Sequence, residues 1–139
     1  MRGRDMILRH IQVGAGSTMG GAEPVIADAV RHGDLLYMSG RAPVDPGTLQ
    51  VVGDGFAEQA EIVLRDIGAV LAAAGSDWDH VLRIECFLAD SGDFAEWNRI
   101  WSERFTSPRP ARTTIVAGFA VPGILIELQV TAAVSVASP

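Results

Sequence analysis

Arg112 is the residue of this 139-residue chain that is best placed to bind a ligand. It follows Pro110 and Ala111 at the mouth of a predicted strand, so a stiff backbone is expected to hold its guanidinium. The planar guanidinium can donate two parallel hydrogen bonds to a carboxylate, and its charge survives partial burial. We therefore expect Arg112 to bind a small carboxylate-bearing molecule. An ordinary ion pair with Glu127, or a surface arginine without a ligand, is the structural alternative.

The histidines and tryptophans have structural explanations. His10, His32 and His80 fall in a strand end, a turn and a loop, and none has a partnered base or metal-ligand spacing. No Cys/His cluster has such spacing either, so no metal site is expected. Trp97 and Trp101 stand four residues apart on a predicted helix, where packing against a sheet is favoured over base stacking.

The first third of the chain predicts strands that lead to a helix. Residues 1–23 hold a short strand, Ile7 to Val13, and a flexible glycine-rich loop, GAGSTMGG, for which an anion-binding nest is the alternative. PVIADAV and LLYMSG flank RHGD, which predicts a β-hairpin. The following stretch, RAPVDPGTLQVVGDG, is typical of a surface excursion and ends at a helix N-cap near Asp54 or Gly55, which Glu58 can strengthen.

A long amphipathic helix is predicted next, with a stop at Gly75. Its apolar stripe comprises Phe56, Ala60, Val63, Leu64, Ile67, Val70, Leu71 and Ala74, and its polar face comprises Glu58, Gln59, Glu61, Arg65 and Asp66. In the strand that follows, Leu82, Ile84, Cys86 and Leu88 alternate with polar residues and form one apolar face.

The last third predicts a second helix and two strands. Ser91 is expected to cap this helix, which carries Phe94, Trp97, Ile100, Trp101 and Phe105 along one stripe. Strands are predicted over 113–117 and 124–134. This order of elements predicts a single α+β domain, in which a mixed sheet has two helices packed on one face and needs a partner on the other.

Composition limits the class of protein and its partners. Apolar residues make up 48% of the chain and charged residues 20%, so part of the apolar surface is expected to face another subunit. A net charge of -6 disfavours nucleic acid as a partner. The single cysteine, Cys86, cannot form an intramolecular disulfide, and there is neither a signal-peptide core nor an apolar run long enough to cross a membrane. A cytoplasmic location is therefore expected.

Several stretches resemble the reactive-intermediate deaminase family, which is also called Rid or YjgF-like. PARTTIVAGFAVPGILIELQV is similar to the C-terminal signature of that family, and LLYMSGRAPVDP is similar to its strand and Ser-Gly-Gln-Pro loop. AVLAAAGSDWDHVLRIECFLAD and DFAEWN are similar to its helix, strand and second helix start. The resemblance covers nearly the whole chain from Pro24 to Thr131.

The resemblance implies a fold, an assembly and a reaction. The fold is the chorismate-mutase-like α+β domain, and the assembly is a homotrimer with ligand clefts between its subunits. The reaction is hydrolysis of a 2-imino or enamino acid, such as 2-aminoacrylate, to a 2-oxo acid and ammonia without a cofactor. Arg112 would anchor the substrate carboxylate, and Glu127 would position the attacking water or relay its protons.

The resemblance also implies further pocket residues. Ser39, Asn98 and Thr114 stand at positions that line the family's pocket, and the backbone around Thr113 would add polar contacts. From the residues alone, Ser39 is a turn residue before Gly40, and Asn98 faces solvent on a helix.

The chain departs from the family pattern at three positions. Ile26 or Val25 replaces a tyrosine, Thr114 replaces a cysteine, and Arg41 replaces the glutamine after Ser39 and Gly40. The added cation is expected to favour a different, doubly acidic substrate, as in a 2-aminomuconate-type deaminase. A noncatalytic trimer that binds a small acid is the alternative from another functional class. An endoribonuclease, a third possibility taken from names used in the family, is disfavoured by the acidic charge.

Overall fold

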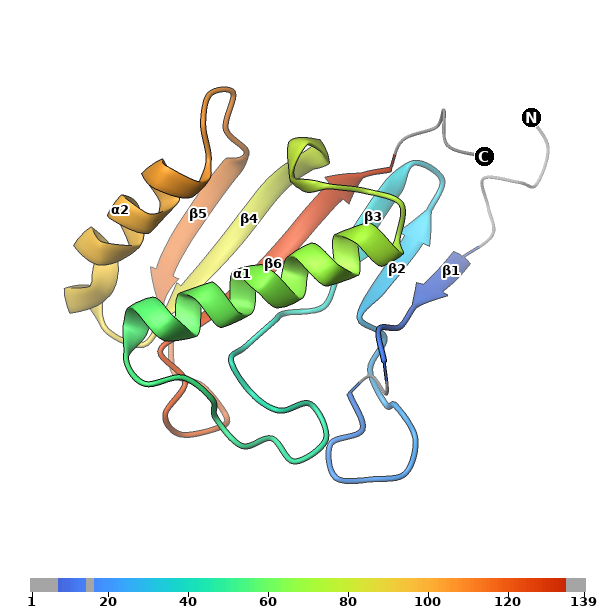
Figure 1. Ribbon diagram of the computed structural model, residues 1–139, viewed down its shortest axis with the longest axis horizontal. Coiled ribbons are helices and arrows are strands. Elements are labelled where there is room, and N and C mark those ends of the chain that lie inside the picture. Colours follow the sequence, from blue (N-terminus) through green and yellow to red (C-terminus); the bar gives the residue numbers. More distant parts are fainter. Residues whose placement is uncertain (1–7, 15–16, 135–139) are drawn as a thin grey trace.

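The computed structural model describes residues 8–14 and 17–134, in which six strands form one mixed sheet (Figure 1). The sheet order is β1-β2-β3-β6-β4-β5, and among these neighbours β4 and β5 are the parallel pair. The strands are β1 (Leu8–Ile11), β2 (Ala29–His32), β3 (Leu35–Met38), β4 (Val81–Leu88), β5 (Ala111–Val116) and β6 (Ile126–Ala133). Ile7 and residues 15–16 of the predicted glycine-rich loop lie outside the described residues.

The predicted hairpin is confirmed. β2 and β3 pair antiparallel, and Gly33 at the turn has a φ of 62°, a left-handed conformation that glycine adopts without steric cost.

Two helices, α1 (Phe56–Ala73) and α2 (Phe94–Arg104), lie on one side of the sheet (Figure 1). The predicted start of α1 is confirmed, because Gly55 is its N-cap and the Glu58 carboxylate accepts a hydrogen bond from the Asp54 amide at 3.1 Å. Its apolar stripe is buried, as predicted. Neither helix is long and apolar enough to cross a membrane.

Gln59 was predicted on the polar face of α1, and that prediction is wrong. Gln59 is only 2% exposed, and its side-chain amide connects the helix to the segment before β6. Nε2 donates to the Gly123 carbonyl at 3.0 Å, and Oε1 accepts from the Leu125 amide at 2.8 Å. These partners satisfy a buried amide, which explains why a polar side chain is stable in this position.

A bulge changes the predicted alternation of β4. The pairing of β4 with β6 shifts register between Val81 and Arg83, so Val81 is buried and Leu82 is 48% exposed. The prediction for Leu82 is therefore wrong, whereas Ile84, Cys86 and Leu88 are buried as expected.

The second helix begins later than predicted. Ser91 lies in a short 3₁₀ turn, η3 (Ser91–Asp93), and the side chain of Asp90, not that of Ser91, accepts a hydrogen bond from the Gly92 amide at 2.6 Å. A similar turn, η2 (Trp78–His80), precedes β4. Trp97, Ile100 and Trp101 of α2 are buried, but Phe94 is 46% exposed.

Strand register assigns side chains to the two faces of the sheet. Aligned residues on neighbouring strands share a face, and successive residues of one strand alternate. Ile84, Arg112 and Val130 are aligned on the face that the helices cover. Phe87, Ile115 and Glu127 are aligned on the uncovered face, and so are Leu35 and Tyr37 of β3, which are 38% and 50% exposed.

Candidate functional site

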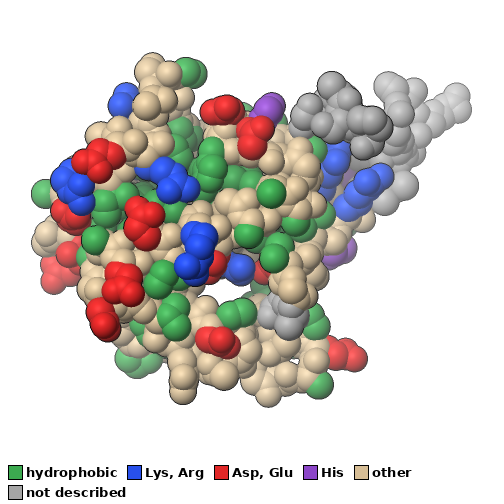
Figure 2. Space-filling model, viewed as in Figure 1, with side chains coloured by type: hydrophobic (Ala, Val, Ile, Leu, Met, Phe, Trp, Pro, Cys, Tyr) green, Lys and Arg blue, Asp and Glu red, His purple; other side chains and the backbone are tan. Residues whose placement is uncertain are grey.

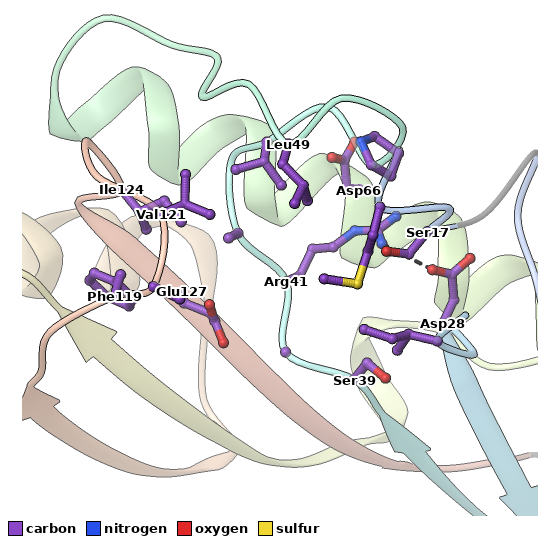
Figure 3. A pocket seen from close by; sticks show the side chains of 17 residues that line it. Ser17, Asp28, Ser39, Arg41, Leu49, Asp66, Phe119, Val121, Ile124 and Glu127 are labelled. Carbon is purple, nitrogen blue, oxygen red and sulfur yellow. Dashed lines mark hydrogen bonds and ion pairs between the residues drawn. The ribbon is translucent and has the colours of Figure 1, made fainter. Parts of the chain in front are cut away.

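A pocket of about 370 Å³ brings two of the predicted site residues, Ser39 and Glu127, together. Its walls come from the segment after β3, the segment between β5 and β6, one residue of α1, and parts of residues 17–28. Figure 2 shows a hollow at this lower side of the molecule, below α1. In Figure 3, Glu127 lies at one end of the pocket with Phe119, Val121 and Ile124, and Asp28 and Ser17 lie at the other.

Glu127 is a half-buried carboxylate in a mainly apolar setting. It extends from β6 on the uncovered face of the sheet, and its side chain lies against the backbone of Gly40. An added Cβ at Gly40 would overlap the carboxylate, so the glycine provides the space that Glu127 occupies. Desolvation by burial raises the pKa of Glu127 above its ordinary value, which makes this carboxyl a stronger proton acceptor than an exposed one.

Ser39 has a fixed hydroxyl. Its Oγ donates to the Ala27 carbonyl at 2.7 Å, and its amide donates to the Asp28 carbonyl at 3.0 Å. Because the hydroxyl proton is used in this bond, the oxygen lone pairs are what Ser39 can offer to an N–H or O–H group of a ligand.

Arg41 reaches to the other end of the pocket, where it meets Asp28 (Figure 3). Its Nη1 lies 3.0 Å from Asp28 Oδ1, and the Asp28 residue is only 4% exposed. Asp28 Oδ2 also accepts a hydrogen bond from the Val13 amide at 2.8 Å. The cation predicted at Arg41 is therefore one half of a largely buried ion pair.

Arg112 lies outside this pocket, on the covered side of the edge strand β5. Its Nη2 donates to Asn98 Oδ1 of α2 at 2.7 Å. The guanidinium carbon lies 5.0 Å from the ring centroid of Trp101 and 5.7 Å from that of Phe94. An amide and two aromatic rings thus hold the guanidinium in one orientation, and no carboxylate of the described residues forms an ion pair with it. The alternative of an ion pair with Glu127 is not what the structure contains.

Thr114 is on the same face as Arg112 and also lies outside the pocket. Its Oγ1 is buried without a hydrogen-bond partner among the described residues, and so is Trp97 Nε1. Both groups lie beside the thiol of Cys86, which is aligned with Thr114 across β4 and β5. Desolvation raises the pKa of this thiol to about 11, so Cys86 is a neutral core side chain at neutral pH.

Within one chain, the predicted site residues therefore fall into two groups that lie apart from each other. Arg112 aligns with Val130, three residues along β6 from Glu127, and β4 lies between the two strands. With strands about 4.8 Å apart and about 3.3 Å per residue, their Cα atoms are separated by about 14 Å. Their side chains also extend from opposite faces of the sheet. A small ligand cannot contact both residues of the same chain.

Sequence reasoning missed Asp28 and Gln59, which shape this region. Asp28 stands in the predicted hairpin strand PVIADAV, where a lone carboxylate among apolar residues is a signal of a buried, partnered charge. Gln59 has no comparable signal, because its neighbours Glu58 and Glu61 make it look like one more polar residue of an exposed face.

A metal site is not evident in the part of the chain that the structure describes. No three His, Cys, Asp or Glu side chains converge there.

The sequence matches a protein family over most of its length. Residues 22–134 match the family model described as endoribonuclease L-PSP. A RutC family protein from Saccharolobus solfataricus is 41% identical over 106 residues, which are 76% of this chain and 84% of that protein. Protein DfrA from Myxococcus xanthus is 39% identical over 103 residues, which are 74% of this chain and 79% of that protein.

Solved structures show the same fold. The crystal structure of a member of the YjgF protein family from Neisseria meningitidis superposes with a TM-score of 0.78 at 31% identity. The match covers 95% of this chain and 98% of that one.

Proposed function

Because this chain belongs to the endoribonuclease L-PSP family, which includes the YjgF and Rid proteins, we propose that it hydrolyses reactive 2-imino or enamino acids to 2-oxo acids and ammonia. The observation that supports this most is the pair of half-sites. Arg112 is an oriented cation outside any ion pair of the described residues, and Glu127 is a carboxyl of raised pKa in a pocket. A cation for the substrate carboxylate and a base for water are what this hydrolysis requires.

The complete site lies between two copies of the chain. Since Arg112 and Glu127 are on opposite faces and about 14 Å apart at their Cα atoms, the Arg112 group of one subunit serves the pocket of its neighbour. The exposed Leu35, Tyr37 and Ile115 give the uncovered face an apolar surface for such a neighbour. A closed ring of subunits gives each pocket one Arg112, and the resemblance to the Rid family makes a homotrimer the ring that we propose.

The reaction begins with the substrate carboxylate on Arg112. Asn98, Phe94 and Trp101 fix the guanidinium, so its two-pronged donor face fixes the orientation of the substrate. Ser39 Oγ accepts a hydrogen bond from the substrate N–H, since its own proton is held by the Ala27 carbonyl.

Water is then added to the C=N bond. As the water oxygen attacks the carbon of the protonated imine, the Glu127 carboxylate takes a proton from the water and the C=N electron pair moves to the nitrogen, which gives a neutral carbinolamine. Glu127 returns this proton to the amino nitrogen, and the C–N bond breaks while the hydroxyl oxygen forms the C=O bond. The hydroxyl proton passes through Glu127 to the departing ammonia, and the 2-oxo acid is released. An enamine substrate is first protonated on its β-carbon to give the same imine. The Thr114 hydroxyl is buried on the Arg112 side of the sheet, so its contribution is to the surroundings of Arg112.

RNA cleavage, which the family description suggests, is less compatible with the residues. A net charge of -6 opposes the phosphate contacts that supply most of the affinity for nucleic acid.

The proposed location is the cytoplasm. The free, buried thiol of Cys86 fits a protein of this reducing compartment, where amino-acid imines arise.

The experiment measures ammonia and 2-oxo acid release from freshly generated 2-aminoacrylate and 2-iminobutyrate. Wild-type protein is compared with Arg112→Ala and with Arg109→Ala, a matched control whose Nε donates to the Phe105 carbonyl. Release above the buffer rate that is lost in Arg112→Ala and kept in Arg109→Ala supports the proposal. Equal rates in all samples would replace it with the noncatalytic alternative, in which the trimer binds a small acid without turnover.

A further inference from the structure

We infer that Asp28 sets the substrate preference of the pocket, because its ion pair with Arg41 leaves a pocket that accepts apolar side chains and rejects a second carboxylate. This inference rests on the proposed function and names the class of substrate. From the sequence alone, Arg41 suggests a doubly acidic substrate. Its ion pair with Asp28 leads to the opposite preference.

The charge of Arg41 is already compensated. Its side chain is 22% exposed, that of Asp28 is 3% exposed, and Nη1 and Oδ1 are 3.0 Å apart. Asp28 is further held through Oδ2 by the Val13 amide. Separating this pair would leave a buried carboxylate without a counter-charge, which costs several times more than a surface ion pair contributes. A ligand carboxylate must therefore share Arg41 with an acid that cannot move away.

The other charged residues that line the pocket are all acids. The lining residues that carry charge are Arg41, Asp28, Asp66 and Glu127, so one guanidinium faces three carboxyl groups. A second carboxylate on the substrate would approach these groups in a partly desolvated space, where like charges repel more strongly than in water. Arg41 is the cation among these lining residues, and it already forms an ion pair with Asp28.

The space around Glu127 suits an apolar substituent. Phe119, Val121 and Ile124 lie at the Glu127 end of the pocket, and Leu49 lies on the wall above them (Figure 3). A cavity of about 150 Å³ holds a benzene molecule. The pocket volume of about 370 Å³ thus leaves room for a leucine-sized or phenylalanine-sized side chain beside the reacting carbon.

The test uses stable 2-oxo acids, so that binding is measured independently of turnover. Calorimetry compares 4-methyl-2-oxopentanoate and phenylpyruvate with 2-oxoglutarate, and 2-oxobutyrate serves as a small reference. We expect the wild-type protein to bind the two large apolar acids at least about tenfold more tightly than 2-oxoglutarate. Equal or tighter binding of 2-oxoglutarate would overturn the inference.

Two variants then assign the preference to Asp28. Asp28→Asn frees Arg41 from its counter-charge, and we expect the ratio of affinities to shift toward 2-oxoglutarate by about tenfold or more. The double variant Asp28→Asn/Arg41→Gln has a neutral pair, and its ratio is expected to show no such shift. An unchanged ratio in folded Asp28→Asn would overturn the assignment, with folding checked by circular dichroism.

A less buried acid provides a second test if Asp28→Asn does not fold. Asp66→Asn removes a partly exposed carboxylate from the lining of the same pocket, and a smaller shift in the same direction is expected. An unchanged ratio in Asp66→Asn would then contradict the charge argument.

Turnover separates this inference from the proposed function. If the imines of leucine and glutamate are both hydrolysed only at the buffer rate while the apolar 2-oxo acids bind preferentially, the proposed reaction is wrong and the pocket preference stands. If both imines are hydrolysed equally well and the 2-oxo acids bind equally, the reaction stands and the preference is wrong.

Discussion

At the scale of single residues, the two groups proposed for the reaction differ in how the structure prepares them. Arg112 is made rigid by an amide and two rings, which lowers the entropy lost when a carboxylate binds. Glu127 is made more basic by burial and has its space next to Gly40. In the proposed reaction, the first arrangement would serve binding and the second proton transfer.

The raised pKa of Glu127 has a consequence for stability. A carboxyl whose pKa is higher in the folded than in the unfolded state binds its proton more tightly when folded, so its ionised form destabilises the fold. This cost is present at pH above the folded pKa and disappears as the pH falls below the unfolded pKa. Because Glu127 is only half-buried, the effect is expected to be small.

Glu127→Gln is therefore expected to raise the melting temperature at pH 7 and to leave it nearly unchanged at pH 4. The same variant is expected to lower kcat by about 100-fold or more while KM stays within a few-fold, because proton transfer is lost and the Arg112 contact is kept. Thermal melts at both pH values and steady-state kinetics check this. A variant that melts lower at pH 7 than the wild type would contradict the burial argument.

At the scale of elements, Gln59 connects the long helix to the pocket. Its amide bonds the Gly123 carbonyl and the Leu125 amide, and the segment between β5 and β6 that carries Phe119, Val121 and Ile124 forms one pocket wall. The helix therefore positions a wall that is far from it in sequence.

Gln59→Leu keeps the volume of the side chain and removes its hydrogen bonds to the backbone of Gly53, Gly123 and Leu125 in a buried place. We expect a loss of about 1–3 kcal/mol in the free energy of unfolding, and faster amide exchange at Leu125 and its neighbours. Gln50→Leu, at an exposed position, is the control and should change stability by about 0.5 kcal/mol or less. Equal effects of the two substitutions, measured by urea unfolding and hydrogen exchange, would show that the Gln59 bonds contribute nothing.

The order and type of the helices and strands could be read from hydrophobic periodicity, because that signal reports local burial. The periodicity of α1 and the hairpin turn at Gly33 are examples of predictions that hold. The bulge at Leu82 and the burial of Gln59 depend on partners distant in sequence, and a local pattern carries no information about them. For the same reason, Arg112 could be selected by its type and place, but its separation from Glu127 could not be foreseen.

At the scale of the whole molecule, the uncovered face of the sheet is where a second chain is proposed to bind. Tyr37 is 50% exposed at β3, and Ile115 is 48% exposed at β5. A face with these side chains is costly to leave in water and is typical of a subunit interface.

Tyr37→Asp places a charge on this face and is expected to convert the proposed trimer to monomer at micromolar concentration, with circular dichroism unchanged and deaminase activity lost. Val52→Asp is the matched control, because Val52 is 39% exposed but lies in the segment before α1, outside the sheet. It should remain a trimer. Analytical ultracentrifugation distinguishes the outcomes, and a Tyr37→Asp trimer with full activity would exclude this face as the interface.

The most direct measurement of the shared site mixes two inactive variants, Arg112→Ala and Glu127→Gln, by joint refolding at equal concentration. If Arg112 of one subunit serves the Glu127 pocket of its neighbour, random assembly leaves one site in four with both groups intact, and the mixture recovers about a quarter of the wild-type deaminase rate. If the mixture refolds to mixed trimers and is no more active than the separate variants, the two residues do not act across a subunit boundary, and the account of a shared site is wrong.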